Sequence, residues 1–228
     1  MIPVAGRPLL DYLLDGLADA GIIDTCLVVG PEHGRMRDHY ARRPPERVRV
    51  HFAVQAEPRG TADAVLAAEA FAAGEPFLVL NSDNHYPTAT LRALREAPAP
   101  ALAGFDRERL AATGNIDRER IRAFALLDVG DDSTLRRIVE KPSAGEMDGS
   151  RLVSMNCWLL DGRIFEACRR IAPSARGELE LPHAAQWLID ERAARFTVVP
   201  GHYPVLDLSS RADVAAVEAH LAALRPAP

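Results

Sequence analysis

The chain has 228 residues, which is one large domain or two small ones with enough length to bury a core. Its composition, 48% hydrophobic and 26% charged with a formal net charge of −5, is ordinary for a globular protein. The 27 basic residues form no stripe, so nucleic acid is not an expected partner. No apolar run approaches the length of a membrane span, so a membrane partner is not expected either.

The cysteines, Cys26, Cys157 and Cys168, are odd in number and have no paired spacing. Free thiols are therefore the expected state, and they suit a reducing compartment. The first residues, from Met1 to Gly6, lack the basic and apolar regions of a signal peptide. We expect a cytoplasmic protein.

In the first half, helical patterns alternate with short apolar runs. The expected elements are a helix from residue 9 to a stop at Gly21, a strand at 25–30, a helix at 32–40, a strand at 48–54, a helix at 61–73, a strand at 77–80 and a helix at 88–95. This alternation favours right-handed βαβ units and a parallel sheet.

The second half has shorter and more varied elements. We expect a strand within 98–105, a charged loop with at most a short helix at 106–120, strands at 123–129 and 135–140, a loop at 143–150, a strand at 152–160, helices at 164–171 and 181–192, short strands at 196–199 and 203–206, and a helix at 210–224. No repeat, low-complexity region or linker divides residues 1–228, so a single domain is expected.

Two acidic residues follow expected strands. The run from Phe77 to Leu80 leads into Asp83, and a second short strand leads into Asp207. Ligands bind past the carboxyl ends of the strands in an open parallel sheet, where carboxylates can hold a divalent cation. The alternatives are a turn residue for Asp83 and helix capping near Asp207, for which Ser209 and Ser210 are better placed.

Two further motifs could bind a nucleotide or a sugar phosphate. Gln55 offers a donor and an acceptor to a base, and Gly60 and Thr61 open a helix where the main chain can approach a ligand. The alternative is a helix capped by the Thr61 side chain after a turn glycine. Glu140 and Lys141 end a strand, where they could bind sugar hydroxyls and a phosphate or form an exposed strand end.

These pieces occur in one order over nearly the whole chain. They are Pro3–Leu10, Gln55 with Gly60–Ala62, Ser82–Asn84, Val139–Pro142, Asn156, Gly177–Glu178 and Asp207. In this order they resemble the sugar-1-phosphate nucleotidyltransferases. The resemblance implies a Rossmann-like three-layer α/β/α fold with a mixed, mostly parallel sheet. It assigns residues 1–105 to a nucleotide-binding half and 106–228 to a sugar-phosphate-binding half.

The resemblance also implies roles for individual residues. Asp83 and Asp207 would bind Mg²⁺, and Lys141 would bind the sugar's phosphate. The other roles would be base binding by Gln55, Gly60 and Thr61, and sugar binding by Asn84, Glu140, Asn156 and Glu178. The substrates would be a nucleoside triphosphate and a sugar 1-phosphate, and the products a nucleotide sugar and pyrophosphate. The oligomeric state stays open, a homo-oligomer included.

Three departures from the family pattern qualify this expectation. The first strand, a Gly-rich loop with an arginine and a Pro-Lys pair all precede the position of Met1 in the family and are absent here. We therefore expect a truncated sheet and impaired catalysis. Ala123 and His183 stand where the family often has glycine and aspartate, which leaves the sugar open. The alternative function is a non-catalytic nucleotide-sugar-binding or regulatory homologue.

Overall fold

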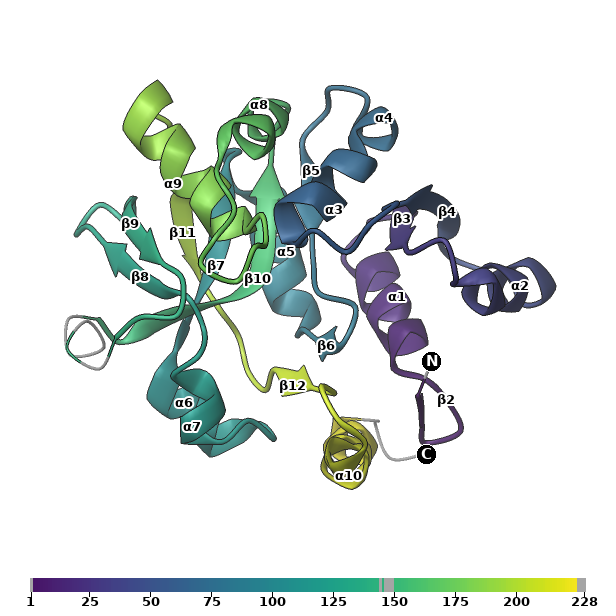
Figure 1. Ribbon diagram of the computed structural model, residues 1–228. Coiled ribbons are helices and arrows are strands. Elements are labelled where there is room, and N and C mark those ends of the chain that lie inside the picture. The colour runs from purple at the N-terminus through teal and green to yellow at the C-terminus, as the bar shows by residue number, and fades with distance from the viewer. Residues whose placement is uncertain (1, 144, 146–149, 225–228) are drawn as a thin grey trace.

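A six-stranded mixed sheet lies at the centre of the molecule (Figure 1). The computed structural model describes residues 2–143, 145 and 150–224, so most of the loop expected at 143–150 lies outside the described residues. The strand order is β11 (Thr197–Pro200), β7 (Ala101–Asp106), β10 (Leu152–Leu160), β8 (Leu126–Val129) and β9 (Leu135–Val139), and β5 (Phe77–Val79) also pairs with β10. The long strand β10 is antiparallel to β5, β7 and β8.

Three two-stranded sheets complete the pairing. They are the parallel pair β3 (Asp24–Val29) and β4 (Arg49–Val54), and the antiparallel pairs β1 (Pro3–Val4) with β2 (Arg7–Pro8) and β6 (Asn84–His85) with β12 (Leu206–Asp207). Among the described strands β3 pairs only with β4 and β5 only with β10, so no ladder joins β3 to β5.

The mixed α/β fold agrees with the expectation, but the expected predominance of parallel pairs does not hold for the described strands. Of the pairs formed by the described strands, only β3–β4 and β7–β11 are parallel. The reason is that β8 and β9 form a hairpin and β10 then runs against its neighbours, so these connections need no helical crossover.

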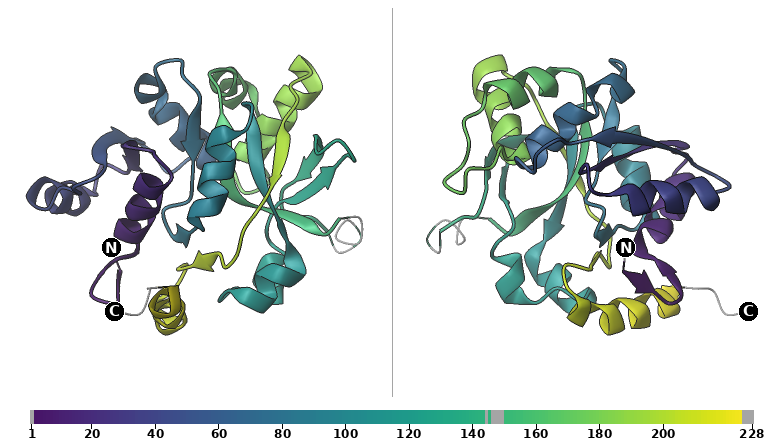
Figure 2. Two further views of the ribbon diagram at one scale, coloured as in Figure 1. Left: turned by 180° about the vertical axis from the view of Figure 1, so that it is seen from behind. Right: turned by 45° about the vertical axis from the view of Figure 1, so that its right-hand side comes forward.

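The helices cover the sheet on both faces (Figures 1 and 2). They are α1 (Leu9–Asp19), α2 (Gly34–Arg42), α3 (Thr61–Ala67), α4 (Glu69–Ala72), α5 (Thr88–Glu96), α6 (Arg107–Thr113), α7 (Arg118–Ile121), α8 (Arg163–Arg170), α9 (Leu181–Arg192) and α10 (Val214–Leu224), the last preceded by a 3₁₀ turn at Arg211–Asp213. Helices α3, α8 and α9 pack together, whereas α5 contacts α1 and the other side of β7, β10 and β11.

The core has a large apolar cluster on each face of the sheet. Strand β5 and the residue after it serve both clusters, because side chains alternate along a strand. Leu78 and Leu80 pack against the cluster that contains α1 and α5, and Phe77 and Val79 against the cluster of α3, α8 and α9. A third, smaller cluster joins the β1–β2 hairpin to α1, β12 and α10.

Several boundaries differ from the expectation. The charged stretch at 106–120 contains two helices, each begun by an aspartate, Asp106 or Asp117, that accepts main-chain hydrogen bonds. The expected helix at 61–73 is two helices separated at Ala68, and the strand expected at 203–206 is limited to Leu206–Asp207. None of the helices in the described ranges is both long enough and apolar enough to cross a bilayer.

Candidate functional site

The pairing of β6 with β12 brings Asp83 and Asp207 to one place. Asp207 lies opposite Asn84 in this ladder, and Leu208 N donates to the carbonyl oxygen of Asp83 at 2.8 Å. Both aspartates line a hollow of about 150 Å³. Five of the ten residues expected in the site line this hollow, namely Asp83, Asn84, Glu140, Asn156 and Asp207.

The electrostatics of the hollow favour a cation. Asp83 is accessible to solvent at its mouth, yet partial desolvation and the nearby charge of Asp207 raise the pKa of Asp83, while Arg120 opposes that shift. Asp207 is 5% exposed. Two carboxylates that repel each other in a partly dehydrated site are stabilised by any positive charge placed between them.

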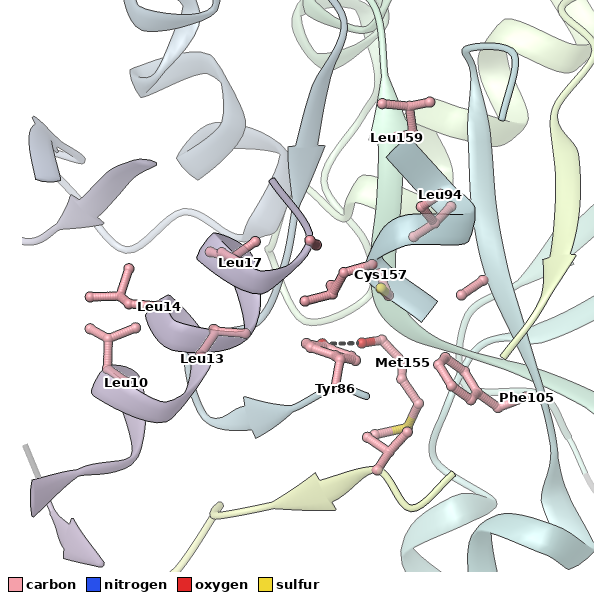
Figure 3. Close-up of a cluster of buried hydrophobic side chains, with 14 of the residues drawn as sticks. Leu10, Leu13, Leu14, Leu17, Tyr86, Leu94, Phe105, Met155, Cys157 and Leu159 are labelled. Atoms are coloured by element: carbon pink, nitrogen blue, oxygen red, sulfur yellow. Dashed lines mark hydrogen bonds between the residues drawn. The ribbon is translucent and has the colours of Figure 1, made fainter. Parts of the chain in front are cut away.

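A buried tyrosine supports the loop that carries Asp83. Tyr86 is 1% exposed, and its hydroxyl donates to Met155 O at 2.6 Å and accepts from Asn81 N at 3.3 Å. The same hydroxyl lies 3.2 Å from Oδ1 of Asn84. Figure 3 shows the ring between helix α1 and Met155. Tyr86 therefore ties the end of β5 to β10 beneath the hollow.

Asn156 enters the hollow because β10 is irregular there. The register of β10 against β7 shifts between Ser154 and Trp158, and Asn156 has a φ of 52°. Asn156 tolerates this left-handed conformation better than most residues. Its Oδ1 accepts from Trp158 Nε1 at 3.2 Å, which fixes the amide orientation.

Glu140 and Lys141 do not face the site together. Strand β9 ends at Val139, and Lys141 has a φ of 48° and is exposed. Glu140 lines the hollow, where burial raises its pKa, and Glu180 adds to that rise while Lys141 opposes it. Lys141 is not among the lining residues.

Gln55, Gly60 and Thr61 form a second group outside the lining of the hollow. Gln55 Nε2 donates to Gly60 O at 3.0 Å and to Oδ2 of Asp63 at 2.9 Å. The expected side-chain cap by Thr61 is wrong. Gly60 is the residue before helix α3, and Thr61 Oγ1 instead accepts from Leu181 N at 2.8 Å, at the start of α9.

Glu178 also lies outside the lining, in an ionic cluster at the start of α9. Arg176 Nη2 is 3.0 Å from an oxygen of Glu178 and 2.5 Å from Oε1 of Glu180. Glu180 is 4% exposed and raises the pKa of Glu140, so this cluster belongs to the same side of the site. No periodic signal in the sequence distinguishes Glu180 from Glu178.

The groups that hold Asp207 were not predicted from the sequence. Ser209 Oγ donates to Asp207 Oδ1 at 2.5 Å, and Arg120 Nη2 lies 2.7 Å from Asp207 Oδ2. Asn115 pairs with the main chain of Asp207, accepting from its N at 2.9 Å and donating to its O at 2.7 Å. Asp207 is not a helix cap, because Ser210 and Asp213 form the capping box.

The donor set fits magnesium. Mg²⁺ is commonly bound in proteins by one or two carboxylates, with waters and substrate phosphates completing the octahedron. Asp83 and Asp207 in the lining of the hollow match that pattern. No group of three or more histidine, cysteine, aspartate or glutamate residues suited to a metal occurs in the described part of the chain.

Comparisons with known proteins point in one direction. The family model described as nucleotidyl transferase matches residues 1–203. A glucose-1-phosphate thymidylyltransferase of Streptomyces griseus is 31% identical over 205 residues, which cover 89% of this chain and 55% of that protein. The bifunctional protein GlmU of Methanococcus vannielii is 29% identical over 193 residues, or 83% of this chain and 42% of that protein. The chain thus spans about half the length of these curated relatives.

Solved structures share the fold. A UDP-glucose pyrophosphorylase complexed with UDP-glucose superposes with a TM-score of 0.78 at 18% identity, covering 99% of this chain and 90% of that one. A UTP-bound UGPase from Acinetobacter baumannii gives a TM-score of 0.76 at 19% identity, covering 99% and 86%. The resemblance indicated by the motifs is confirmed at this level: the chain belongs to the nucleotidyl transferase family.

Proposed function

We propose that the protein is a Mg²⁺-dependent sugar-1-phosphate nucleotidyltransferase, which forms a nucleotide sugar and pyrophosphate from a nucleoside triphosphate and a sugar 1-phosphate. The observation that carries the proposal is the β6–β12 pairing, which joins Asp83 and Asp207 at a hollow lined by Asn84, Glu140 and Asn156. Family membership supports the same reaction class.

The reaction forms one P–O bond and breaks another. A phosphate oxygen of the sugar 1-phosphate attacks the α-phosphorus in line, and the bond from that phosphorus to the leaving pyrophosphate breaks. Such transfer depends on alignment and charge neutralisation more than on a general base. Bound Mg²⁺ would neutralise the phosphate oxygens as charge develops. Asp83 and Asp207, which line the hollow, would hold it, and the exposed Lys141 would bind the sugar's phosphate from outside this lining.

The sugar would occupy the hollow. Asn84, Glu140 and Asn156 offer amide and carboxylate groups that match sugar hydroxyls. Asn156 Oδ1 accepts from Trp158 Nε1, and Asn84 Nδ2 donates to Leu206 O, which holds these two side chains in place. Glu178 would extend the same side of the site. All of these groups come from one chain, so the proposal does not require a homo-oligomer.

The base would bind beside Gln55, Gly60 and Thr61. Both protons of Gln55 Nε2 are directed to acceptors, Gly60 O and Asp63 Oδ2. The amide therefore presents Oε1, an acceptor, to a ligand. An imide N–H, as in uracil or thymine, is the complementary donor. We infer a uridine or thymidine triphosphate.

The three free cysteines agree with a cytoplasmic setting.

Pyrophosphate release tests the proposal. The chain is incubated with Mg²⁺, a sugar 1-phosphate and each nucleoside triphosphate in turn, and Asp83→Asn is compared with Asp131→Asn, an exposed carboxylate in the β8–β9 turn. In keeping with the impaired catalysis expected from the sequence, we expect slow release that needs Mg²⁺, is lost in Asp83→Asn and is kept in Asp131→Asn. Calorimetric binding of a nucleotide sugar without release from any substrate pair would instead support the non-catalytic alternative.

A further inference from the structure

Arg120 bridges two carboxylates that belong to different parts of the chain. Figure 1 shows β12 running between the helices α6–α7 and α10. From α7, Arg120 places Nη2 at 2.7 Å from Asp207 Oδ2 and Nη1 at 2.8 Å from Asp213 Oδ1. The side chains of Arg120, Asp207 and Asp213 are 28%, 7% and 13% exposed, so solvent screens these charges only in part.

The two contacts of Arg120 differ in kind. Nη1 forms an aligned hydrogen bond with Asp213, whereas the buried Nη2 lies 2.7 Å from Asp207 Oδ2 without an aligned hydrogen bond to any described residue. The contact with Asp207 is therefore mainly electrostatic. The guanidinium can lose it without losing an aligned hydrogen bond, because Asp213 retains the other nitrogen.

Asp207 does not depend on Arg120 for its position. Ser209 donates to its Oδ1, Asn115 pairs with its main-chain N and O, and the ladder with Asn84 fixes the strand. Removing the guanidinium should consequently change the charge beside Asp207 more than the place of its carboxylate.

The charge of Arg120 acts on any cation that reaches Asp207. A positive group at hydrogen-bond distance from one ligand reduces the negative potential that attracts a divalent ion, and the effect is strong where water is partly excluded. Without an ion, the same group lies 2.7 Å from Asp207 Oδ2 and offsets the charge of this carboxylate.

We propose that Arg120 is a positioning residue that acts through Asp207: it is the counter-charge of this carboxylate in the cation-free site, and it lowers the affinity of the site for a divalent cation. This inference rests on the proposed function, in which Asp83 and Asp207 hold Mg²⁺. The inference adds Arg120 as a group that sets the affinity of this site for the ion.

A titration with Mn²⁺, followed by the electron paramagnetic resonance signal of the free ion, measures the effect without catalysis. Arg120→Met removes the charge at similar length, and Arg120→Lys keeps it. We expect Arg120→Met to bind Mn²⁺ roughly tenfold tighter than the wild-type chain. It should also unfold at a lower temperature without the ion and gain more thermal stability on Mn²⁺ addition. Arg120→Lys should keep the wild-type affinity.

Unchanged or weaker Mn²⁺ binding in Arg120→Met would overturn the proposal. Asp213→Asn gives a second test that does not require Arg120→Met to fold. Without the Asp213 carboxylate, the guanidinium interacts with Asp207 alone, so the affinity for Mn²⁺ should fall several-fold. An unchanged affinity overturns the proposal. Asp83→Asn distinguishes a failure of the proposed metal site from a failure of the role proposed for Arg120. If Asp83→Asn binds Mn²⁺ as tightly as the wild type, the metal site is refuted, and the role of Arg120 with it.

Discussion

Gly60 packs against the main chain of Leu179 so closely that a Cβ at position 60 would lie 2.5 Å from the carbonyl oxygen of Leu179. Hydrogen bonds run in both directions beside this contact, from Leu179 N to Arg59 O at 2.7 Å and from Ala62 N to Leu179 O at 2.8 Å. The loop that carries Gln55 and the segment that carries Glu178 are thus joined. The proposed base and sugar subsites are therefore connected through main-chain hydrogen bonds.

The first prediction concerns Gly60→Ala. Its φ of 112° and the contact with Leu179 both oppose a side chain, so we expect a loss of about 3 kcal/mol in the free energy of unfolding, measured with urea. Gly74→Ala is the matched control, because Gly74 has a φ of 86° and a Cβ at that position would meet no atom of the described residues within 4 Å. Its loss should be about 1 kcal/mol. Equal losses would show that the packing contact contributes nothing.

The second prediction concerns the orientation of the Gln55 amide. Asp63→Ala removes one of the two acceptors of Nε2, so the amide can turn and present its NH₂ group to the base. The preference for UTP over CTP, whose ring offers an acceptor in place of the imide donor, should fall about tenfold in calorimetric binding. Asp131→Asn should keep the wild-type ratio. A ratio that is unchanged in Asp63→Ala would show that Asp63 has no part in base selection.

The third prediction concerns Tyr86. Tyr86→Phe leaves Met155 O and Asn81 N without their partner in a buried place, and we expect a cost of about 1–3 kcal/mol in urea unfolding. Because the loop with Asp83 loses a support, Mn²⁺ affinity should fall as well.

Tyr203→Phe is the control for that experiment. The Tyr203 hydroxyl accepts from Asp106 N at 2.6 Å, and Tyr203 is not part of the hollow's lining. It should lose stability but keep Mn²⁺ affinity. Should Tyr86→Phe lose stability with no change in Mn²⁺ binding, its role is structural only.

The fourth prediction is a pH dependence of stability that arises from Glu140. Burial and Glu180 raise the pKa of Glu140 in the folded chain above its ordinary 4.5, so the folded state binds the proton more tightly than the unfolded state. The stabilisation is complete below the unfolded pKa and is lost as the pH rises through the folded pKa. Because the glutamine of Glu140→Gln cannot ionise, this variant should not lose that stability as the pH rises.

The stability difference between Glu140→Gln and the wild type should therefore grow in favour of the variant from about pH 4 to pH 7, as measured by urea unfolding without divalent ions. Asp132→Asn serves as a control of opposite sign, because hydrogen bonds from Thr134 lower the pKa of Asp132. A difference for Glu140→Gln that shrinks with rising pH would contradict the assigned direction.

The sequence indicated site residues where an acidic side chain follows a recognisable strand pattern. Asp83 was recognisable because a strongly apolar strand precedes it, and Asp207 because a second acid follows a strand late in the chain. That these two meet depends on β6 and β12, which are each two residues long and carry no periodic signal. The motif order of a family indicated in advance that Asp83 and Asp207 bind one ion, but neither it nor the local pattern predicted the ladder between β6 and β12.

Arg120 and Asn115 show what the sequence could not provide. They lie in a charged stretch without hydrophobic period, whose helices α6 and α7 depend on caps by Asp106 and Asp117. The partners of both side chains are about ninety residues away in sequence, at Asp207 and Asp213. Asp106 and Asp117 were available as helix-start signals, but nothing local indicated which face would meet β12.

Mn²⁺ binding to the wild type, Asp83→Asn, Asp207→Asn and the double variant tests most directly whether Asp83 and Asp207 hold one divalent ion together. We predict one ion per chain, a large loss of affinity in either single variant, and little further loss in the double variant, because the ligands act as a unit. Independent, additive losses, or one ion bound with wild-type affinity after either substitution, would contradict a shared ion.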